Sequence, residues 1–218
     1  MTARLKARLI ATSLVFCGAS LLAQAPAPAT QTHTSNLGFS YALPTDWQVM
    51  EAPPTLSDMK QQQAQEASSE SEKKGIECIQ IAMTARHGDP TSMVVVMALP
   101  FGCFGQPMTE KDLPGFAEGA SEGLKKTLVI SAPAYGSYTL GSHNVWIERA
   151  QGALIGHPEA EYTAEVACTL LKKSAACWMA MAADPASLKT FEQGMVTLDG
   201  EPPTALVPAT AFDKKPAQ

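Results

Sequence analysis

The residues Gly119-Ala120-Ser121-Glu122-Gly123 spell G-x-S-x-G, the pattern that holds the nucleophilic serine of many hydrolases. In those enzymes a strand ends just before the serine and a helix starts just after it, and an acid and a histidine follow along the chain. Glu148 and His157 follow Ser121 in that order. The pattern, however, falls inside a helix predicted over 112–126, with no strand running into it. We therefore expect a protein without catalytic residues, and a serine hydrolase that uses Ser121 is the alternative.

Three glycines of this segment suggest a packing role instead. Gly115, Gly119 and Gly123 recur every four residues, so they share one face of the predicted helix. A flat face of this kind would let the helix lie close against a sheet. On this interpretation Gly119→Leu destabilises the fold, whereas Ser121→Ala leaves it unchanged.

Histidines are the other candidate functional residues, because their ring nitrogens could bind a metal ion. His87, His143 and His157 are isolated in predicted turns or at strand starts, and no H-x-H or H-x-x-x-H spacing occurs among them. We expect solvated histidines, no metal site and no cofactor. An exported protein that binds a small ligand or a metal through these loops is a further alternative.

Two cysteines stand at matched distances from one predicted turn. Cys168 and Cys177 are equally far from Lys172-Lys173, so a turn centred on the lysines places them directly opposite each other. In a two-residue hairpin they form a non-hydrogen-bonded pair, where side chains approach most closely. A four-residue turn with the same centre gives the same pairing. The register predicts a Cys168–Cys177 disulfide.

The spacing of the other two cysteines does not determine whether they form a disulfide. Cys78 and Cys103 lie around two predicted strands, over 76–85 and 92–101, and could close their hairpin. Direct pairing of those strands would, however, place Cys78 opposite Ala98. The sequence therefore leaves a Cys78–Cys103 disulfide open.

The first 25 residues have the order of a secretory signal peptide. Arg4, Lys6 and Arg8 precede an apolar run of about 14 residues, which is shorter than the roughly 20 that a spanning helix needs. Small residues then lead to a predicted cleavage site between Ala25 and Pro26. We expect an exported protein, periplasmic or extracellular, without stable membrane insertion after cleavage.

Cleavage changes both the charge and the cysteine count. It removes three basic residues and Cys17, leaving 13 basic and 21 acidic residues, a net charge of −8, and four cysteines. A negative chain repels nucleic acid and anionic lipid. An even cysteine number in an oxidising compartment favours disulfides.

The sequence predicts that the rest of the chain forms one domain. We predict a flexible linker over 26–35, a single domain over 36–199, and a disordered Pro-rich tail over 200–218. The domain holds an exposed helix over 55–74, a strand over 92–101 that is apolar on both faces, and a last helix that starts at Asp184-Pro185. About eight strands and three helices predict an α+β fold, with a central antiparallel sheet flanked by helices on both faces.

The motif Phe39-Ser40-Tyr41-x-x-Pro44-x-x-Trp47 resembles the opening of the Mog1/PsbP-like domains. The order of the predicted elements over 36–199 is similar as well. The resemblance implies an α/β/α sandwich and a non-catalytic accessory role that binds another envelope or extracellular protein. It carries no site residue over to this chain.

Overall fold

The computed structural model describes residues 29–50, 54–67, 69–103, 108–131 and 133–213. The predicted signal peptide, the cleavage site between Ala25 and Pro26, and residues 214–218 lie outside the described residues. No helix in the described part is long and apolar enough to cross a membrane.

The smaller of two sheets has four antiparallel strands. In spatial order they are β1 (Thr30–Thr34), β2 (Phe39–Pro44), β11 (Met195–Leu198) and β12 (Thr204–Ala205). Because side chains alternate between the faces of a strand, Phe39, Tyr41 and Leu43 of β2 share one face, and all three are buried. This apolar face has to pack on another layer.

That layer is an antiparallel sheet of eight strands. They are β3 (Gln48–Met50), β4 (Gln80–His87), β5 (Ser92–Pro100), β10 (Ser174–Ala182), β9 (His157–Leu170) and β8 (His143–Leu154), followed by β6 (Leu128–Ile130) and β7 (Ala134–Leu140), which both pair with β8. Every residue of β10 is buried, as expected of a central strand that is covered on both faces.

The described helices are short. They are α1 (Pro54–Glu66), α2 (Glu70–Cys78), the 3-10 helix η1 (Phe101–Cys103), α3 (Leu113–Lys125) and α4 (Pro185–Gln193). The side chain of Asp184 caps α4 by accepting the N–H groups of Ala186 and Ser187, and Pro185 suits the first helical position. The predicted helix over 55–74 is in fact two helices, and β4 begins at Gln80 rather than at Ile76.

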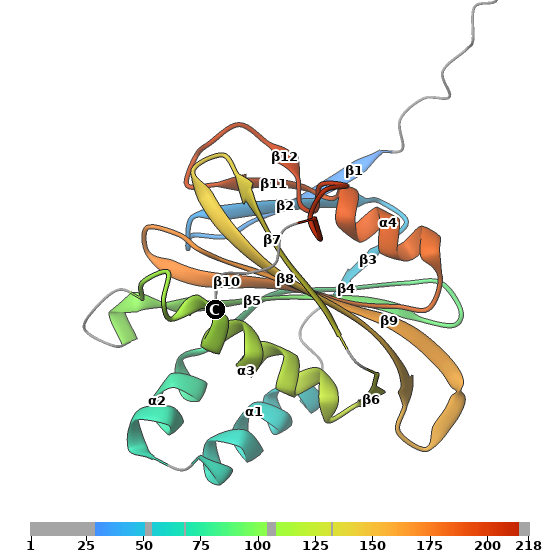
Figure 1. Cartoon of the computed structure of the whole chain (residues 1–218), viewed down its shortest axis with the longest axis horizontal. Coiled ribbons are helices and arrows are strands. Elements are labelled where there is room, and N and C mark those ends of the chain that lie inside the picture. The colour runs from blue at the N-terminus through green and yellow to red at the C-terminus, as the bar shows by residue number, and fades with distance from the viewer. Residues whose placement is uncertain (1–28, 51–53, 68, 104–107, 132, 214–218) are drawn as a thin grey trace, which may run out of the picture.

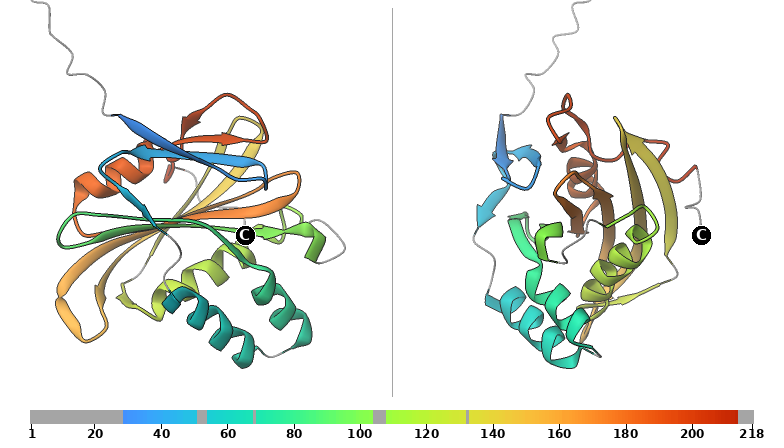
Figure 2. Two further views of the ribbon diagram at one scale, coloured as in Figure 1. Left: turned by 180° about the vertical axis from the view of Figure 1, so that it is seen from behind. Right: turned by 90° about the vertical axis from the view of Figure 1, so that its left-hand side faces the viewer.

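The fold is mostly β and is not the helix-flanked α/β/α sandwich that we predicted. One face of the large sheet carries α3, with α1 and α2 beside it (Figures 1 and 2). The other face is covered mainly by the small sheet, with α4 next to it. The prediction was wrong because the ends of the chain pair with each other, β2 with β11, and this pairing supplies a second sheet where we expected helices.

The main core lies between the two sheets. Trp178 of β10 is 1% exposed, and its ring packs edge-on against Phe39, with ring centroids 5.3 Å apart. The hydroxyl of Tyr41 donates a 2.9 Å hydrogen bond to the carbonyl oxygen of Phe191 in α4. A second cluster, which includes Leu113, fills the space between α3 and the large sheet. These two layers of packing explain why strands in the middle of the large sheet are apolar on both faces.

Two predicted disordered segments are ordered where the structure describes them. Thr30–Thr34, in the predicted linker, forms β1 and pairs with β2. In the predicted tail, Leu206 and Ala211 are buried in the main core. The prolines of this segment misled the prediction, because Pro202 and Pro203 are exposed whereas Leu206 and Ala211, further along the chain, reach the core.

The register around Cys168 and Cys177 is as predicted. Cys177 pairs with Cys168, and the N–H of Leu171 donates to the carbonyl oxygen of Ser174 across the Lys172-Lys173 turn. The Cα atoms of the two cysteines are 4.2 Å apart, the close spacing of a non-hydrogen-bonded pair, and their sulfurs form a disulfide.

The structure also joins Cys78 and Cys103, which flank β4 and β5, so this bond closes the hairpin from outside its paired residues. Cys78 ends α2 and Cys103 lies in η1, while Gln80 takes the place opposite Ala98 that direct pairing would give to Cys78. Two disulfides fit a protein of an oxidising compartment.

Candidate functional site

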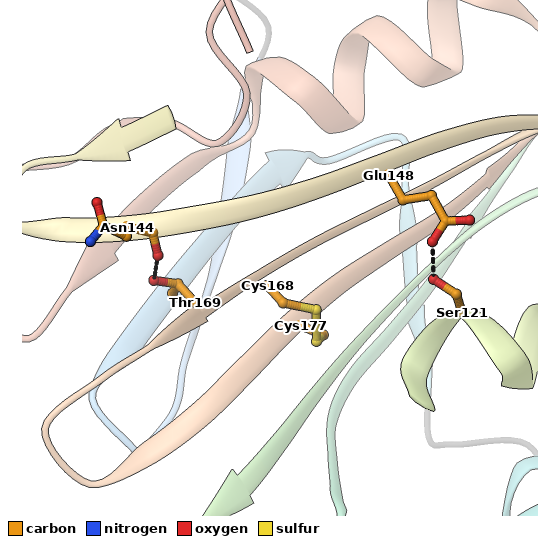
Figure 3. Close-up of a disulfide and its surroundings, with 6 residues drawn as sticks. All are labelled: Ser121, Asn144, Glu148, Cys168, Thr169 and Cys177. Carbon is orange, nitrogen blue, oxygen red and sulfur yellow. Dashed lines mark hydrogen bonds between the residues drawn. A yellow bond between two sulfur atoms is a disulfide. The ribbon is translucent and has the colours of Figure 1, made fainter. Parts of the chain in front are cut away.

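Ser121 is a buried residue that anchors α3. It lies on the face of α3 that meets the large sheet, and it is 2% exposed. Its hydroxyl donates a 2.6 Å hydrogen bond to Oε2 of Glu148 on β8, which is 6% exposed (Figure 3). A nucleophilic serine must present Oγ to substrate and pass its proton to a base. This Oγ is covered by protein, so the described geometry does not present it to a substrate.

His157 does not join Ser121 and Glu148. It lies at the start of β9, with its side chain 68% exposed and Nδ1 3.2 Å from Oε1 of Glu159. Glu148 pairs with Val166, nine residues further along β9. Nine residues of strand span roughly 30 Å, so the three predicted triad residues are not brought together.

The glycines of α3 face away from the sheet, contrary to the prediction. A Cβ atom added to Gly115, Gly119 or Gly123 would meet no atom within 4 Å. The helix packs instead through Leu113, Ala117, Ala120 and Ser121. Small alanine and serine side chains provide the close approach that we had assigned to the glycines.

Ser121→Ala is therefore expected to lower the free energy of unfolding by about 1–3 kcal/mol, because it removes a donor from a buried carboxylate. Gly119→Ala, on the exposed face of the same helix, is expected to raise it by about 0.5–1 kcal/mol, because alanine is the better helix former. Urea unfolding of both variants measures the two effects. An unchanged Ser121→Ala would contradict the anchoring role, and loss of an ester-hydrolysing activity in that variant would show that Ser121 is catalytic.

The candidate histidines lie far from one another in the fold. His87, at the end of β4, stacks on Trp47 with ring centroids 5.3 Å apart, and its Nε2 is 3.4 Å from Oδ2 of Asp46. His143 starts β8, and His157 starts β9 at the opposite end of the β8–β9 pair. Within the residues that the structure describes, no three His, Cys, Asp or Glu side chains are grouped so that they could hold a metal ion.

His143 lies in a cluster of polar residues that holds three loops together. Its Nε2 is 3.7 Å from Oδ2 of Asp199 and 3.7 Å from Oε1 of Glu201. Asp199 accepts the N–H of Lys172 in the β9–β10 turn, and Glu201 accepts the N–H and the hydroxyl of Ser142 in the β7–β8 turn. The bonds from Ser142 hold the pKa of Glu201 below its usual value. The carboxylates thus serve as turn anchors.

A small cavity lies beside this cluster. It has a volume of about 280 Å³, and its walls include the apolar side chains of Leu140, Val196 and Leu198 together with Glu201. Ligand pockets span roughly 300–1,000 Å³ and present polar groups that are free to orient the ligand. This cavity is smaller, and its carboxylate already accepts bonds from Ser142. We assign it no ligand.

A buried ionic cluster between the two layers was missed by the sequence reasoning. Glu165 of β9 is fully buried and accepts a hydrogen bond from Nε of Arg149 on β8. The guanidinium of Arg149 also contacts the carboxylate of Glu192 in α4, and it lies 4.5 Å above the ring of Phe212. Nothing in the sequence indicated that a second sheet covers the face of β9 that carries Glu165.

Burial raises the pKa of Glu165 from 4.5 to about 7, although the neighbouring Arg149 lowers it in part. A carboxyl group with such a pKa is suited to proton transfer when substrate can reach it. Glu165 has no exposed surface, so the cluster links β8, β9 and α4 and does not form an accessible site.

A further accessible feature is the outer edge of β7. Within the described residues β7 pairs with β8 alone, and the two are joined by a two-residue turn at Gly141-Ser142. Gly141 has φ of 56°, a conformation that favours glycine at the first position of a II′ hairpin turn. Counting back from this turn, Tyr135, Ser137 and Thr139 direct their N–H and C=O groups away from β8. This row of backbone groups is a template for another strand.

β7 carries none of the usual protections of a sheet edge. Its sequence AYGSYTL has no charged residue and no proline, and its pairing with β8 runs without a bulge. The other edge strands differ: β3 and β6 have only three residues each, β12 has two, and β1 has no apolar side chain. β7 is therefore the edge best suited to pairing.

An aromatic side chain marks this edge. Tyr135 is 47% exposed, and its ring lies 5.6 Å from that of Trp146 on β8, which is 8% exposed. Tyrosine and tryptophan are the residues most often found at the energetic centres of protein interfaces. The sequence contained the uncharged strand, but only the sheet order shows that it lies at an edge.

Comparisons with protein-family models and with curated proteins found no match to this sequence.

Proposed function

We propose that this chain is an exported, non-catalytic binding module that takes up an extended segment of a partner protein along β7. The free edge of β7 carries the proposal. An added strand would bond to the outward backbone groups of Tyr135, Ser137 and Thr139, and the Tyr135 ring would pack on its side chains. The net charge of −8 after the predicted cleavage favours a partner segment that is apolar and not acidic.

Two further observations support an exported binding role. The two disulfides suit an oxidising compartment, which agrees with the predicted signal peptide and with a periplasmic or extracellular location. The resemblance of Phe39–Trp47 to Mog1/PsbP-like domains points to an accessory role too. Since the fold implied by that resemblance was wrong, the proposal rests on β7.

Ser137→Pro tests the edge directly. The N–H of Ser137 points away from β8, so proline removes an outward donor and keeps the ladder with β8. Linear peptides selected from a phage-displayed library on the wild-type chain are the probe. Ser137→Pro is expected to weaken their binding at least about tenfold, the equivalent of about 1.4 kcal/mol, as measured by calorimetry.

Ser137→Thr is the matched control, because it keeps the N–H and a good strand former, and it is expected to bind as the wild type does. Amide exchange should slow at Tyr135, Ser137 and Thr139 when peptide binds. Peptides that bind Ser137→Pro equally well, or that protect a different strand, would overturn the proposal, as would failure to select any peptide.

A further inference from the structure

The two disulfides lie in different environments. Cys168 and Cys177 are 0% exposed and lie between β9 and β10, on the side of the large sheet that α3 covers. Cys78 and Cys103 are each only partly buried, at the end of α2 and in η1. A reductant must bring a thiolate up to one of the sulfurs, so the disulfide between Cys78 and Cys103 is the one within reach.

This accessible disulfide links the end of α2 to η1 and so ties down a helical hairpin, α1 and α2, in which few of the described side chains are buried. Among the described side chains of α1 and α2, Ala64 alone is buried. Nζ of Lys60 donates a 2.7 Å bond to the carbonyl oxygen of Ile79, and Lys126 forms an exposed ion pair with Glu66 at 3.1 Å. Exposed ion pairs contribute little to stability. Among the described contacts of the hairpin, the covalent link is therefore the strongest attachment.

Apolar residues lie beneath this attachment. Leu99, Phe101 and Ala175 are buried in one cluster, and Cys78 and Ile79 pack against it. The hairpin and the disulfide thus cover a patch that would become partly exposed if α1 and α2 moved away.

We propose that Cys78–Cys103 is a thiol–disulfide exchange site, and that its reduction by a dithiol protein releases the α1–α2 hairpin from the large sheet. A thiolate of the dithiol attacks Sγ of Cys78, the bond to Sγ of Cys103 breaks, and Cys103 leaves as a thiolate. The second thiolate of the dithiol then attacks the mixed disulfide and releases Cys78. The dithiol is oxidised to a disulfide, and the two cysteines gain two electrons and, once protonated, two protons.

The position of Cys78 accounts for this direction of attack. Cys78 is the last residue of α2, next to Glu77, and the negative end of a helix disfavours a thiolate there. The sulfur that forms the more stable thiolate is the better leaving group. Cys103 therefore leaves first.

Stepwise reduction of the full wild-type chain with dithiothreitol tests the proposal. Alkylation followed by mass spectrometry reports which cysteines are free, and brief trypsin treatment reports release of the hairpin through cleavage after Lys73 and Lys74. Cys78 and Cys103 should become alkylated at a reductant concentration at least about tenfold below that needed for Cys168 and Cys177. Cleavage after the two lysines should rise over the same range and fall again on reoxidation.

The matched variants are the two double cysteine replacements. Cys78→Ser with Cys103→Ser should be cleaved after Lys73 and Lys74 without reductant. Cys168→Ala with Cys177→Ala should keep these sites protected until dithiothreitol is added. Simultaneous reduction of both disulfides in the wild type, or selective reduction without a rise in cleavage, would overturn the proposal.

Discussion

Replacing Arg149 by methionine is expected to lower the free energy of unfolding by about 3–5 kcal/mol at pH 8. Methionine keeps the length of the apolar stem but leaves the fully buried carboxylate of Glu165 without its cation. It also removes the contact of the guanidinium with Glu192 in α4. A buried charge that loses its partner costs far more than an exposed ion pair contributes.

The loss should depend on pH in a defined direction. In the wild type the pKa of Glu165 rises from 4.5 to about 7 on folding. The folded state therefore holds this proton more tightly, so the stability linked to Glu165 is fully present below about pH 4.5 and is lost as pH rises to about 7. Without Arg149 the carboxyl group stays protonated to higher pH. The variant should thus be less impaired at pH 5, where Glu165 is neutral, than at pH 8.

Urea unfolding at pH 5 and pH 8 measures both parts of this prediction. Arg86→Met, at an exposed position on β4, is the control and should stay within about 0.5 kcal/mol of the wild type. Glu165→Gln should flatten the wild-type decline between pH 4.5 and 7. An equal loss for Arg149→Met at both pH values would show that Glu165 does not carry the effect.

Leu206→Ala is expected to lower the free energy of unfolding by about 2–5 kcal/mol. Leu206 is 0% exposed and lies in the core between the sheets. Its N–H donates to the carbonyl oxygen of Gly194, and its own carbonyl oxygen accepts the hydroxyl of Tyr138. These bonds hold the residue in place, so the core is not free to close over the space left by the smaller side chain.

Thr210→Ala, an exposed position of the same segment, should leave stability within about 0.5 kcal/mol. Thermal unfolding of the two variants shows whether the segment that holds Leu206 and Thr210 is ordered. If it is ordered, Leu206→Ala lowers the melting temperature and Thr210→Ala does not. Equal melting temperatures for wild type, Leu206→Ala and Thr210→Ala would support the Pro-rich disordered tail that the sequence suggested.

Local patterns predicted individual elements well. The equal spacing of Cys168 and Cys177 around the lysine pair predicted the β9–β10 register, since a strand register follows from its turn. Asp184-Pro185 predicted the start of α4, because capping and a fixed φ act within a single turn of helix. Valines on both faces of one segment predicted that β5 is covered on both sides.

The candidate site was harder to predict. Ser121 follows a hydrolase pattern, yet its burial depends on which face of α3 meets the sheet, and the glycines pointed to the wrong face. The burial of Glu165 could not be predicted, because the sheet that covers it is built from the two ends of the chain. Sequence spacing carries little information about contacts between residues so far apart.

The sequence by itself determined the short-range features of this protein: the turn that aligns Cys168 with Cys177, the cap of α4, and the apolar strands of the large sheet. Only the tertiary structure decided that β2 pairs with β11, that Glu165 is buried beside Arg149, and that β7 stands at an edge. The physical reason is the range of the interactions. A turn or a cap involves a few adjacent residues, whereas the order of strands depends on how the whole chain buries its apolar faces.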